Sequence, residues 1–359
     1  MEPKRNAPAF HGLWERINDD PCVRGSEANR AAESTSTDPR SAQQRSIVTM
    51  ARTIVHEAAG SLVEAVVRER AASRVTVLRC AAGSCIWARV APLAREREGL
   101  DHARLAARYS DQGEQYLGKR GFHVIGADSV NACGGINDWT LGRDFDGDCR
   151  LNTLDGKPHG TQNKVTPQQS VMNQVLQALL TFEAAFPGEG WGYFLTQDSK
   201  AVRWSDVAFT GLIHGAQSAV CFATELRVWR AVPQSGPRDN TCGYGVATGP
   251  YDPTKPPFDV NCPASHIASW IDGPSATPID RYFGFAGGND AQYGDILFTM
   301  QRMKFVGDFV NIDTVVAPYG GSHRFYSLAA GHNSFPNGFP IAAINIAFDV
   351  PPENQNPKF

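Results

Sequence analysis

Beyond about residue 120, hydrophobic positions follow two alternating patterns: short apolar runs, and longer segments with apolar residues at three- and four-residue spacings. The short runs predict buried strands at 122–128, 206–210, 228–233, 281–287 and 323–328. The longer segments predict helices at 167–186, 216–225, 292–305 and 341–348. Strands that alternate with helices are typical of an α/β fold with a mostly parallel central sheet and helices on both faces.

The first third of the chain has a different composition, rich in arginine and poor in aromatic residues. Polar residues dominate its beginning, so we expect residues 1–46 to be disordered. Apolar residues at helical spacing predict a helix over 47–72, and residues 74–80 predict a strand. A second helix is expected over 101–120.

These patterns divide the chain into a disordered segment 1–46, an atypical N-terminal region 47–100 and an α/β domain 101–359. Within the α/β domain, residues 236–278 are rich in proline and glycine. We interpret this segment as a cap-like insertion between two strands of the sheet.

Charge and hydropathy exclude several classes of partner. The net charge of -3 and the pI of about 6.3 give no electrostatic reason to expect nucleic acid or an anionic membrane. No apolar run approaches the roughly 20 residues of a membrane span. The charged start is not followed by an apolar segment, so no secretory signal is visible.

The chain contains 8 cysteines, some of them spaced to close loops. Cys133 and Cys149 bracket one Gly/Asp-rich loop, and Cys242 and Cys262 bracket a Pro/Gly-rich one. This arrangement is typical of disulfides in an exported protein, although buried or free thiols fit it equally well. No C-x-x-C or H-E-x-x-H spacing occurs, so a zinc site is not expected.

Residues 211–215 read Gly-Leu-Ile-His-Gly, between a predicted strand and a predicted helix. This is the context of the G-x-S-x-G nucleophile elbow, a sharp strand-to-helix turn that exposes a serine oxygen. Ile213 occupies the position of the serine. Because an isoleucine side chain has no lone pair, it cannot attack a carbonyl carbon.

Chain order nominates the other members of a catalytic triad. Asp290 follows the predicted strand 281–287, and its carboxylate could fix a histidine tautomer; Asp295 fits less well, because it falls inside the next helix. His332 follows the predicted strand 323–328, whereas His323 lies at the start of that strand. The backbone NH of His214 is one expected donor of an oxyanion hole.

Residues 100–355 resemble secreted α/β-hydrolase-fold serine esterases that hydrolyse polyesters and lipids. The resemblance rests on 211–215, 288–290 and 330–332. It implies an ester substrate of small-molecule, lipid or polyester type, with Asp290 as acid, His332 as base and residue 213 as nucleophile. The chain departs from the family at Ile213, and residues 80–84 do not show the family's His-Gly oxyanion segment.

One acidic stretch has the spacing of a calcium loop. Positions 1, 3, 5, 9 and 12 of such a loop correspond to Asp144, Asp146, Asp148, Asn152 and Asp155. Cys149 stands where the loop normally has glycine, and a solvated acidic loop explains the same composition. Apart from this candidate calcium site, no cofactor is expected.

Two functions remain open at this point. The first is an inactive or strongly impaired esterase, a pseudoenzyme that keeps the fold and the degenerate triad. The second is a non-catalytic protein that uses the hydrolase cleft to bind an apolar ligand or a partner. A third explanation is a decayed or misread gene, which would account for both the unusual first third of the chain and the isoleucine at position 213.

Overall fold

The computed structural model describes residues 63–68, 75–80, 85–86, 116–128, 142–160 and 163–355. All of these residues belong to one unit, Ala51–Phe359. The expectation of disorder over 1–46 concerns residues outside the described ranges, as does most of the expectation for 47–100.

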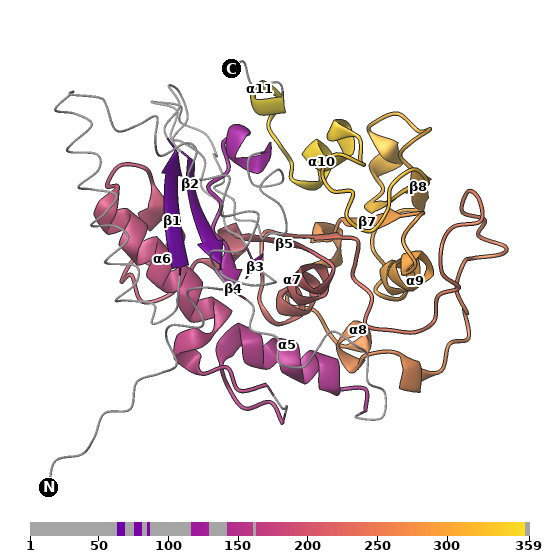
Figure 1. The fold of residues 1–359 in the computed structure, drawn as a ribbon, viewed down its shortest axis with the longest axis horizontal. Coiled ribbons are helices and arrows are strands. Elements are labelled where there is room, and N and C mark those ends of the chain that lie inside the picture. The colour runs from indigo at the N-terminus through magenta and orange to yellow at the C-terminus, as the bar shows by residue number, and fades with distance from the viewer. Residues whose placement is uncertain are drawn as a thin grey trace, which may run out of the picture. The chain divides into compact units, whose positions relative to one another are not determined.

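Five parallel strands form the central sheet, in the order β5-β6-β7-β9-β8 (Figure 1). In chain order they are β5 (Ala208–Leu212), β6 (Arg230–Gln234), β7 (Gly284–Gly287), β8 (Phe309–Asn311) and β9 (Arg324–Ser327). Every residue of β5 and β7 is buried, as in parallel strands that are covered on both faces. The α/β class expected from the sequence is confirmed.

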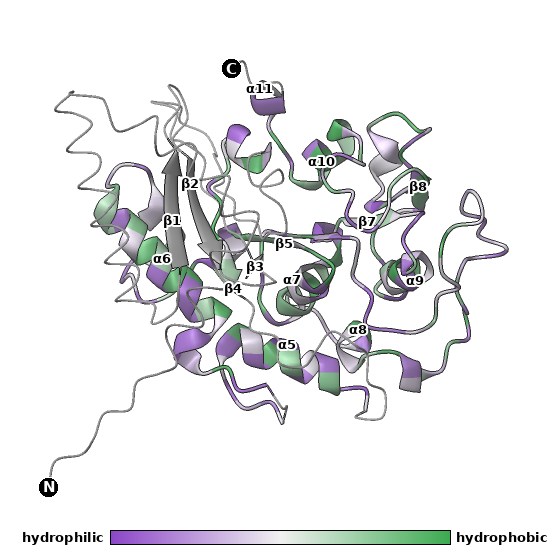
Figure 2. Cartoon of the chain, in the orientation of Figure 1, coloured by the Kyte–Doolittle hydropathy of each residue, from purple (hydrophilic) through white to green (hydrophobic). Residues whose placement is uncertain are grey.

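Four helices follow the expected pattern: α6 (Val171–Ala185), α7 (His214–Glu225), α9 (Tyr293–Arg302) and α10 (Ile341–Ala347). Figure 1 shows α7 and α9 on one side of the strands and α10 on the other. Polar and apolar residues alternate along α6 in Figure 2. The buried residues Val171, Val175, Leu179 and Phe182 recur every three or four positions, so one stripe of α6 enters the core.

The start of α6 is set by two caps in succession. Thr166 and Pro167 begin a short 3₁₀ turn, η2 (Pro167–Gln169), where the sequence predicted the α-helix itself. The α-helix begins only after Ser170, whose hydroxyl accepts a hydrogen bond from the Asn173 amide at 3.2 Å.

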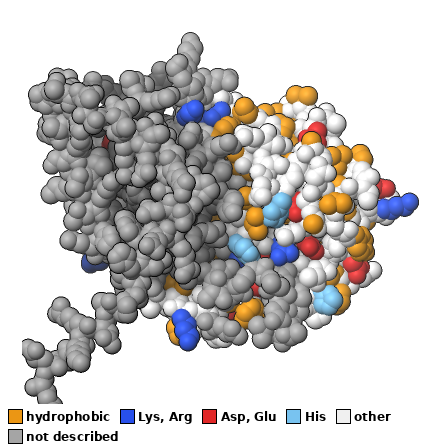
Figure 3. Space-filling view, in the orientation of Figure 1, with side chains coloured by type: hydrophobic (Ala, Val, Ile, Leu, Met, Phe, Trp, Pro, Cys, Tyr) orange, Lys and Arg blue, Asp and Glu red, His pale blue; other side chains and the backbone are white. Residues whose placement is uncertain are grey.

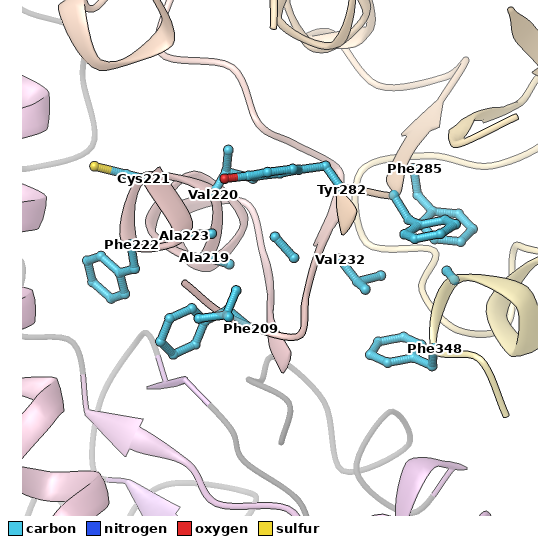
Figure 4. Close-up of a cluster of buried hydrophobic side chains, with 14 of the residues drawn as sticks. Phe209, Ala219, Val220, Cys221, Phe222, Ala223, Val232, Tyr282, Phe285 and Phe348 are labelled. Carbon is cyan, nitrogen blue, oxygen red and sulfur yellow. The ribbon is translucent and has the colours of Figure 1, made fainter. Parts of the chain in front are cut away.

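The core lies where α7 packs against the first strands of the sheet. Figure 4 shows Phe209 of β5 and Phe222 of α7 in this cluster, and their rings meet edge to face with centroids 5.9 Å apart. Phe209, Phe222 and Phe285 are fully buried. The Phe209–Phe222 contact stabilises α7 against the sheet, whereas the ring of Phe285 packs against Phe325, Phe335 and Phe339.

Two expectations for the earlier part of the chain are wrong. Residues 63–68, expected within a helix, form strand β1 (Val63–Arg68), which pairs antiparallel with β2 (Val75–Cys80). The three valines of β1 explain the difference, because β-branched side chains favour strands. The strand expected over 122–128 is reduced to β4 (Ala127–Asp128), which pairs with β3 (Cys85–Ile86).

The elements that the sequence did not predict include α5 (Phe145–Asp155), α8 (Ser269–Asp272), strand β8 and the short helix α11 (Pro352–Gln355). Helix α8 lies in the Pro/Gly-rich segment 236–278, and the role of that segment as a cap remains a prediction. The face in Figure 3 shows basic, acidic and apolar side chains of the described residues interspersed. None of the helices in the described ranges is long and apolar enough to span a membrane.

Candidate active site

Ile213 forms a strained turn between β5 and α7. Its backbone angles are φ 54 and ψ -112, and its carbonyl oxygen accepts hydrogen bonds from the amides of Ala216 and Gln217. A β-branched residue rarely adopts a positive φ, and such a conformation costs on the order of 1–3 kcal/mol. The backbone is therefore held in the sharp strand-to-helix turn that an elbow requires, although the side chain at its apex is aliphatic.

The glycines of the motif permit a very close contact between strand and helix. A Cβ atom at Gly211 would lie 2.5 Å from the carbonyl carbon of Gly215. A Cβ atom at Gly236, in the segment after β6, would lie 2.4 Å from the Cβ of Ala216. Side chains at Gly211 and Gly236 would push α7 away from the sheet, so the turn depends on glycine at these positions.

Asp290 and His332 form a hydrogen-bonded pair. The distance from Asp290 Oδ2 to His332 Nδ1 is 2.7 Å, and Asp290 is only 2% exposed. The other carboxylate oxygen accepts a hydrogen bond from the Gln292 amide at 2.9 Å. His332 Nε2 forms no hydrogen bond within the part of the chain that the structure describes. A histidine held in this way at Nδ1 is oriented to exchange a proton at Nε2.

The pairing of β7 with β9 explains why these two residues meet. Both strands run in the same direction, so the loops that follow them leave from the same edge of the sheet. The Asn289 amide donates to the Ala330 carbonyl at 2.9 Å, and a Cβ at Gly287 would lie 2.8 Å from that same oxygen. The two loops are thus in direct contact on either side of the Asp290–His332 hydrogen bond.

The end of β6 connects this pair to the turn at Ile213. The Ile213 amide donates to the Gln234 carbonyl at 3.2 Å. The hydroxyl of the next residue, Ser235, donates to the His332 carbonyl at 2.7 Å. The three positions expected from the sequence, Ile213, Asp290 and His332, therefore lie on loops at one edge of the sheet and are linked through two consecutive residues.

The alternative acid and base have other contacts. Asp295 lies within α9, accepts a hydrogen bond from the Gly243 amide at 2.7 Å, and has its pKa raised by burial. His323 stacks on Phe283 and places Nδ1 3.1 Å from the Tyr282 carbonyl oxygen. Burial lowers the pKa of His323 to about 4. Of these four side chains, Asp290 and His332 contact each other, whereas Asp295 and His323 contact other residues.

His214 supplies the first amide of α7. In the described ranges, neither His214 nor Gly215 donates its amide to a backbone carbonyl, as is usual for the first turn of a helix. These amides can stabilise a negatively charged oxygen. Burial and the nearby Arg150 guanidinium lower the pKa of the His214 imidazole to about 4. The ring is therefore neutral at pH 7, and its buried Nδ1 has no hydrogen-bond partner among the described residues.

A buried ion pair behind α7 was not found by sequence reasoning. Arg150 of α5 donates to both carboxylate oxygens of Asp239, at 2.7 and 2.8 Å. Arg150 also donates to Ser218 Oγ of α7 at 3.1 Å, and Asp239 accepts from the Trp270 ring NH at 3.0 Å. This cluster joins α5, α7, α8 and the segment after β6 within the core.

The acidic stretch that was expected to form a calcium loop forms helix α5 instead. Asp144 is the N-cap residue of α5, and Asp146, Asp148, Asn152 and Asp155 lie along this helix. The rise of the helix spreads these positions over about 16 Å along its axis, and Asp146 lies on the opposite face from the others, so their oxygens do not converge on one ion. Asn152 instead donates to the carbonyls of Lys157 and Val165. No group of three or more His, Cys, Asp or Glu residues among those described could hold a metal ion.

The disulfide expected between Cys242 and Cys262 is present, with a Cα–Cα distance of 5.6 Å. Cys149 is also disulfide-bonded, and its expected partner, Cys133, lies outside the described residues. Cys221 is a free, buried thiol on α7. The segment that the Cys242–Cys262 bond closes contacts the loop that carries Asp290, since the amide of Ala247 donates to the Gly288 carbonyl at 2.8 Å.

Comparison with known proteins provides no relative for this chain. No protein-family model matches it, and no curated protein or solved structure does so. The candidate site therefore rests on the residues and distances given above.

Proposed function

We propose that this chain is a serine carboxylester hydrolase of the α/β-hydrolase superfamily in which the nucleophile has been replaced, leaving a degenerate triad. The observation that carries this proposal is the 2.7 Å contact between Asp290 and His332, on loops that adjoin the strained turn at Ile213. A buried carboxylate on a histidine is common in proteins, but its position next to an elbow-like turn is specific to nucleophilic hydrolases.

The arrangement supports an acid, a base and one side of an oxyanion site, but it provides no attacking atom. His332 would take a proton from a hydroxyl at position 213 and return it to the leaving alcohol, while Asp290 stabilises the imidazolium. The first amides of α7 would bind the oxyanion. Because Ile213 has no hydroxyl, the natural chain forms no acyl-enzyme, and its turnover of esters is absent or very weak.

The test is to restore the hydroxyl with Ile213→Ser. This variant should show a burst of product with an activated ester and stoichiometric labelling by a serine-directed phosphonate. The unaltered protein should show neither. Ile213→Ser combined with His332→Gln should lose the burst, since the base is then absent. Phosphonate labelling of the unaltered protein at another serine that depends on His332 would contradict the proposal.

A second function is binding without catalysis, and the half-exposed aliphatic side chain of Ile213 at the apex favours it. An uncharged His214 beside Ile213 suits an apolar or neutral ligand. Such a ligand should raise the melting temperature of the unaltered protein without product formation, because it binds the folded state preferentially. The Cys242–Cys262 disulfide supports secretion or another oxidising compartment.

A further inference from the structure

His332 is held from two different strands. On the side of β7, its ring contacts Asp290, and the amide of Asn289 donates to the Ala330 carbonyl in the same loop. On the side of β6, the contact is a single hydrogen bond from Ser235 Oγ to the His332 carbonyl, at 2.7 Å. Asp290 thus orients the His332 ring, while Ser235 fixes the backbone of the loop that carries His332.

The residue before Ser235 is fixed to the elbow strand. Gln234 accepts the Ile213 amide at 3.2 Å and pairs with Leu212 in the parallel ladder. Its side-chain amide donates to Thr210 Oγ1 of β5 at 2.7 Å. Gln234 is 6% exposed and Thr210 is fully buried, so these contacts are shielded from water. Gln234 and Ser235 therefore connect the turn at Ile213 to His332, through one hydrogen bond at each end.

Ser235 has no access to a substrate. The residue is fully buried, and its hydroxyl donates a hydrogen bond to the His332 carbonyl at 2.7 Å. Its backbone has φ 47, in the left-handed region that a serine adopts infrequently. The Ser235 amide donates to the Phe285 carbonyl of β7 at 3.0 Å, so the backbone is held on that side as well. Ser235 is thus excluded as a replacement nucleophile.

We infer that Ser235 is a positioning residue, whose hydroxyl sets the distance between the His332 imidazole and the side chain at position 213. This inference rests on the proposed function, because it assigns His332 to the elbow. Without the hydroxyl, the Asp290–His332 pair keeps its contacts with the loop of β7, but its link to the end of β6 is lost. The separation between base and apex then increases while the pair itself remains intact.

The thiol pKa of a cysteine introduced at position 213 reports this separation, and the experiment does not depend on enzymatic activity. In Ile213→Cys, an imidazolium at His332 next to the thiolate should lower the thiol pKa below its ordinary value of about 8.5. The thiol pKa is followed by the ultraviolet absorbance of the thiolate during a pH titration. Adding His332→Gln gives the thiol pKa with no imidazole present.

Ser235→Ala in the Ile213→Cys background should raise the thiol pKa by about one unit, a tenfold loss of thiolate at a pH below both values. Ser235→Gly removes the same hydroxyl and suits φ 47 better, so it serves if the alanine variant does not fold. The matched control is Thr224→Val, which removes another buried hydroxyl, 2.7 Å from the Cys221 carbonyl at the opposite end of α7. This control should leave the thiol pKa unchanged.

The outcomes separate the inference from the proposed function. A change in the thiol pKa with His332→Gln and with both Ser235 variants, but not with Thr224→Val, supports the positioning role of Ser235. A shift with His332→Gln alone overturns that role and leaves the proposed function in place. No shift with His332→Gln shows that the imidazole is not beside the apex, and it overturns both.

Discussion

Arg150 and Asp239 form a bidentate ion pair that is almost completely removed from solvent, with their side chains 7% and 1% exposed. The pair lies behind α7, and the guanidinium also contacts Ser218 of that helix. Two buried charges are tolerated here because each satisfies the other and because Trp270 donates to Asp239.

Removing one member of this pair should destabilise the protein strongly. Asp239→Asn leaves a buried guanidinium without its counter-ion, and we expect a loss of about 3–5 kcal/mol in the free energy of unfolding. Urea denaturation measures this loss. Arg281→Gln, at a half-exposed cation 4.0 Å from Asp280, is the control and should have a far smaller effect. Equal losses in the two variants would contradict a specific role for the buried pair.

Substitution of Ile213 by glycine should increase stability. Glycine adopts φ 54 without steric conflict, so the relief of strain, on the order of 1–3 kcal/mol, should exceed the loss of a half-exposed side chain. Ile341→Gly provides the comparison, since this exposed isoleucine begins α10 and its replacement should lower stability. The two substitutions should therefore shift the denaturation midpoint in opposite directions. A lower midpoint for Ile213→Gly would show that the turn is not strained.

His214 should make folding stability depend on pH. Its pKa falls from 6.5 to about 4 in the folded protein, so the unfolded state binds more protons between these values. The His214 contribution to the free energy of unfolding therefore keeps its full value above about pH 6.5, and it decreases progressively as the pH falls from 6.5 towards 4. His323 behaves in the same way, with a folded pKa of about 4.

Denaturation at several pH values between 4 and 7 tests this expectation. His214→Gln should reduce the slope of stability against pH, and adding His323→Gln should reduce it further. An unchanged slope in the double variant would refute the assignment.

The Cys242–Cys262 bond should contribute about 3 kcal/mol, because it closes a loop whose ends are 20 residues apart and so restricts the unfolded chain. Replacing both cysteines by alanine is the measurement, with thermal unfolding as the readout. Site-directed variants are preferable to a reductant, since Cys149 is disulfide-bonded as well. Cys221→Ala, at the free thiol, is the control, and its smaller loss reflects only the removal of one buried sulfur atom.

The sequence predicted Asp290 and His332 correctly as neighbours, because each follows a strand whose apolar run is easy to recognise and parallel strands end at one edge. Ser235 and the Arg150–Asp239 pair were missed. The Ser235 contact joins residues 97 positions apart and the ion pair joins residues 89 apart. Such contacts depend on how strands and helices pack, which local pattern does not encode.

The prediction of a loop over the acidic residues 144–155 differs from the structure for a related reason. The glycine and aspartates of this stretch disfavour a helix locally, yet Gly147 lies against Trp270, where an added Cβ would be 3.2 Å from the indole ring. Tertiary packing therefore stabilises α5 where composition favours a loop. Strand β8 was missed because it has three half-buried residues at the sheet edge and shows no apolar run.

The close approach of Gly211 to Gly215 has a consequence for protein engineering. The turn is enforced by backbone packing on either side of Ile213, so we expect any residue introduced at position 213 to adopt the same backbone conformation. A library that varies this one codon would display serine, cysteine, aspartate or a non-natural amino acid on an otherwise unchanged scaffold. The chain thus provides a natural host for comparing different reactive groups in a single environment.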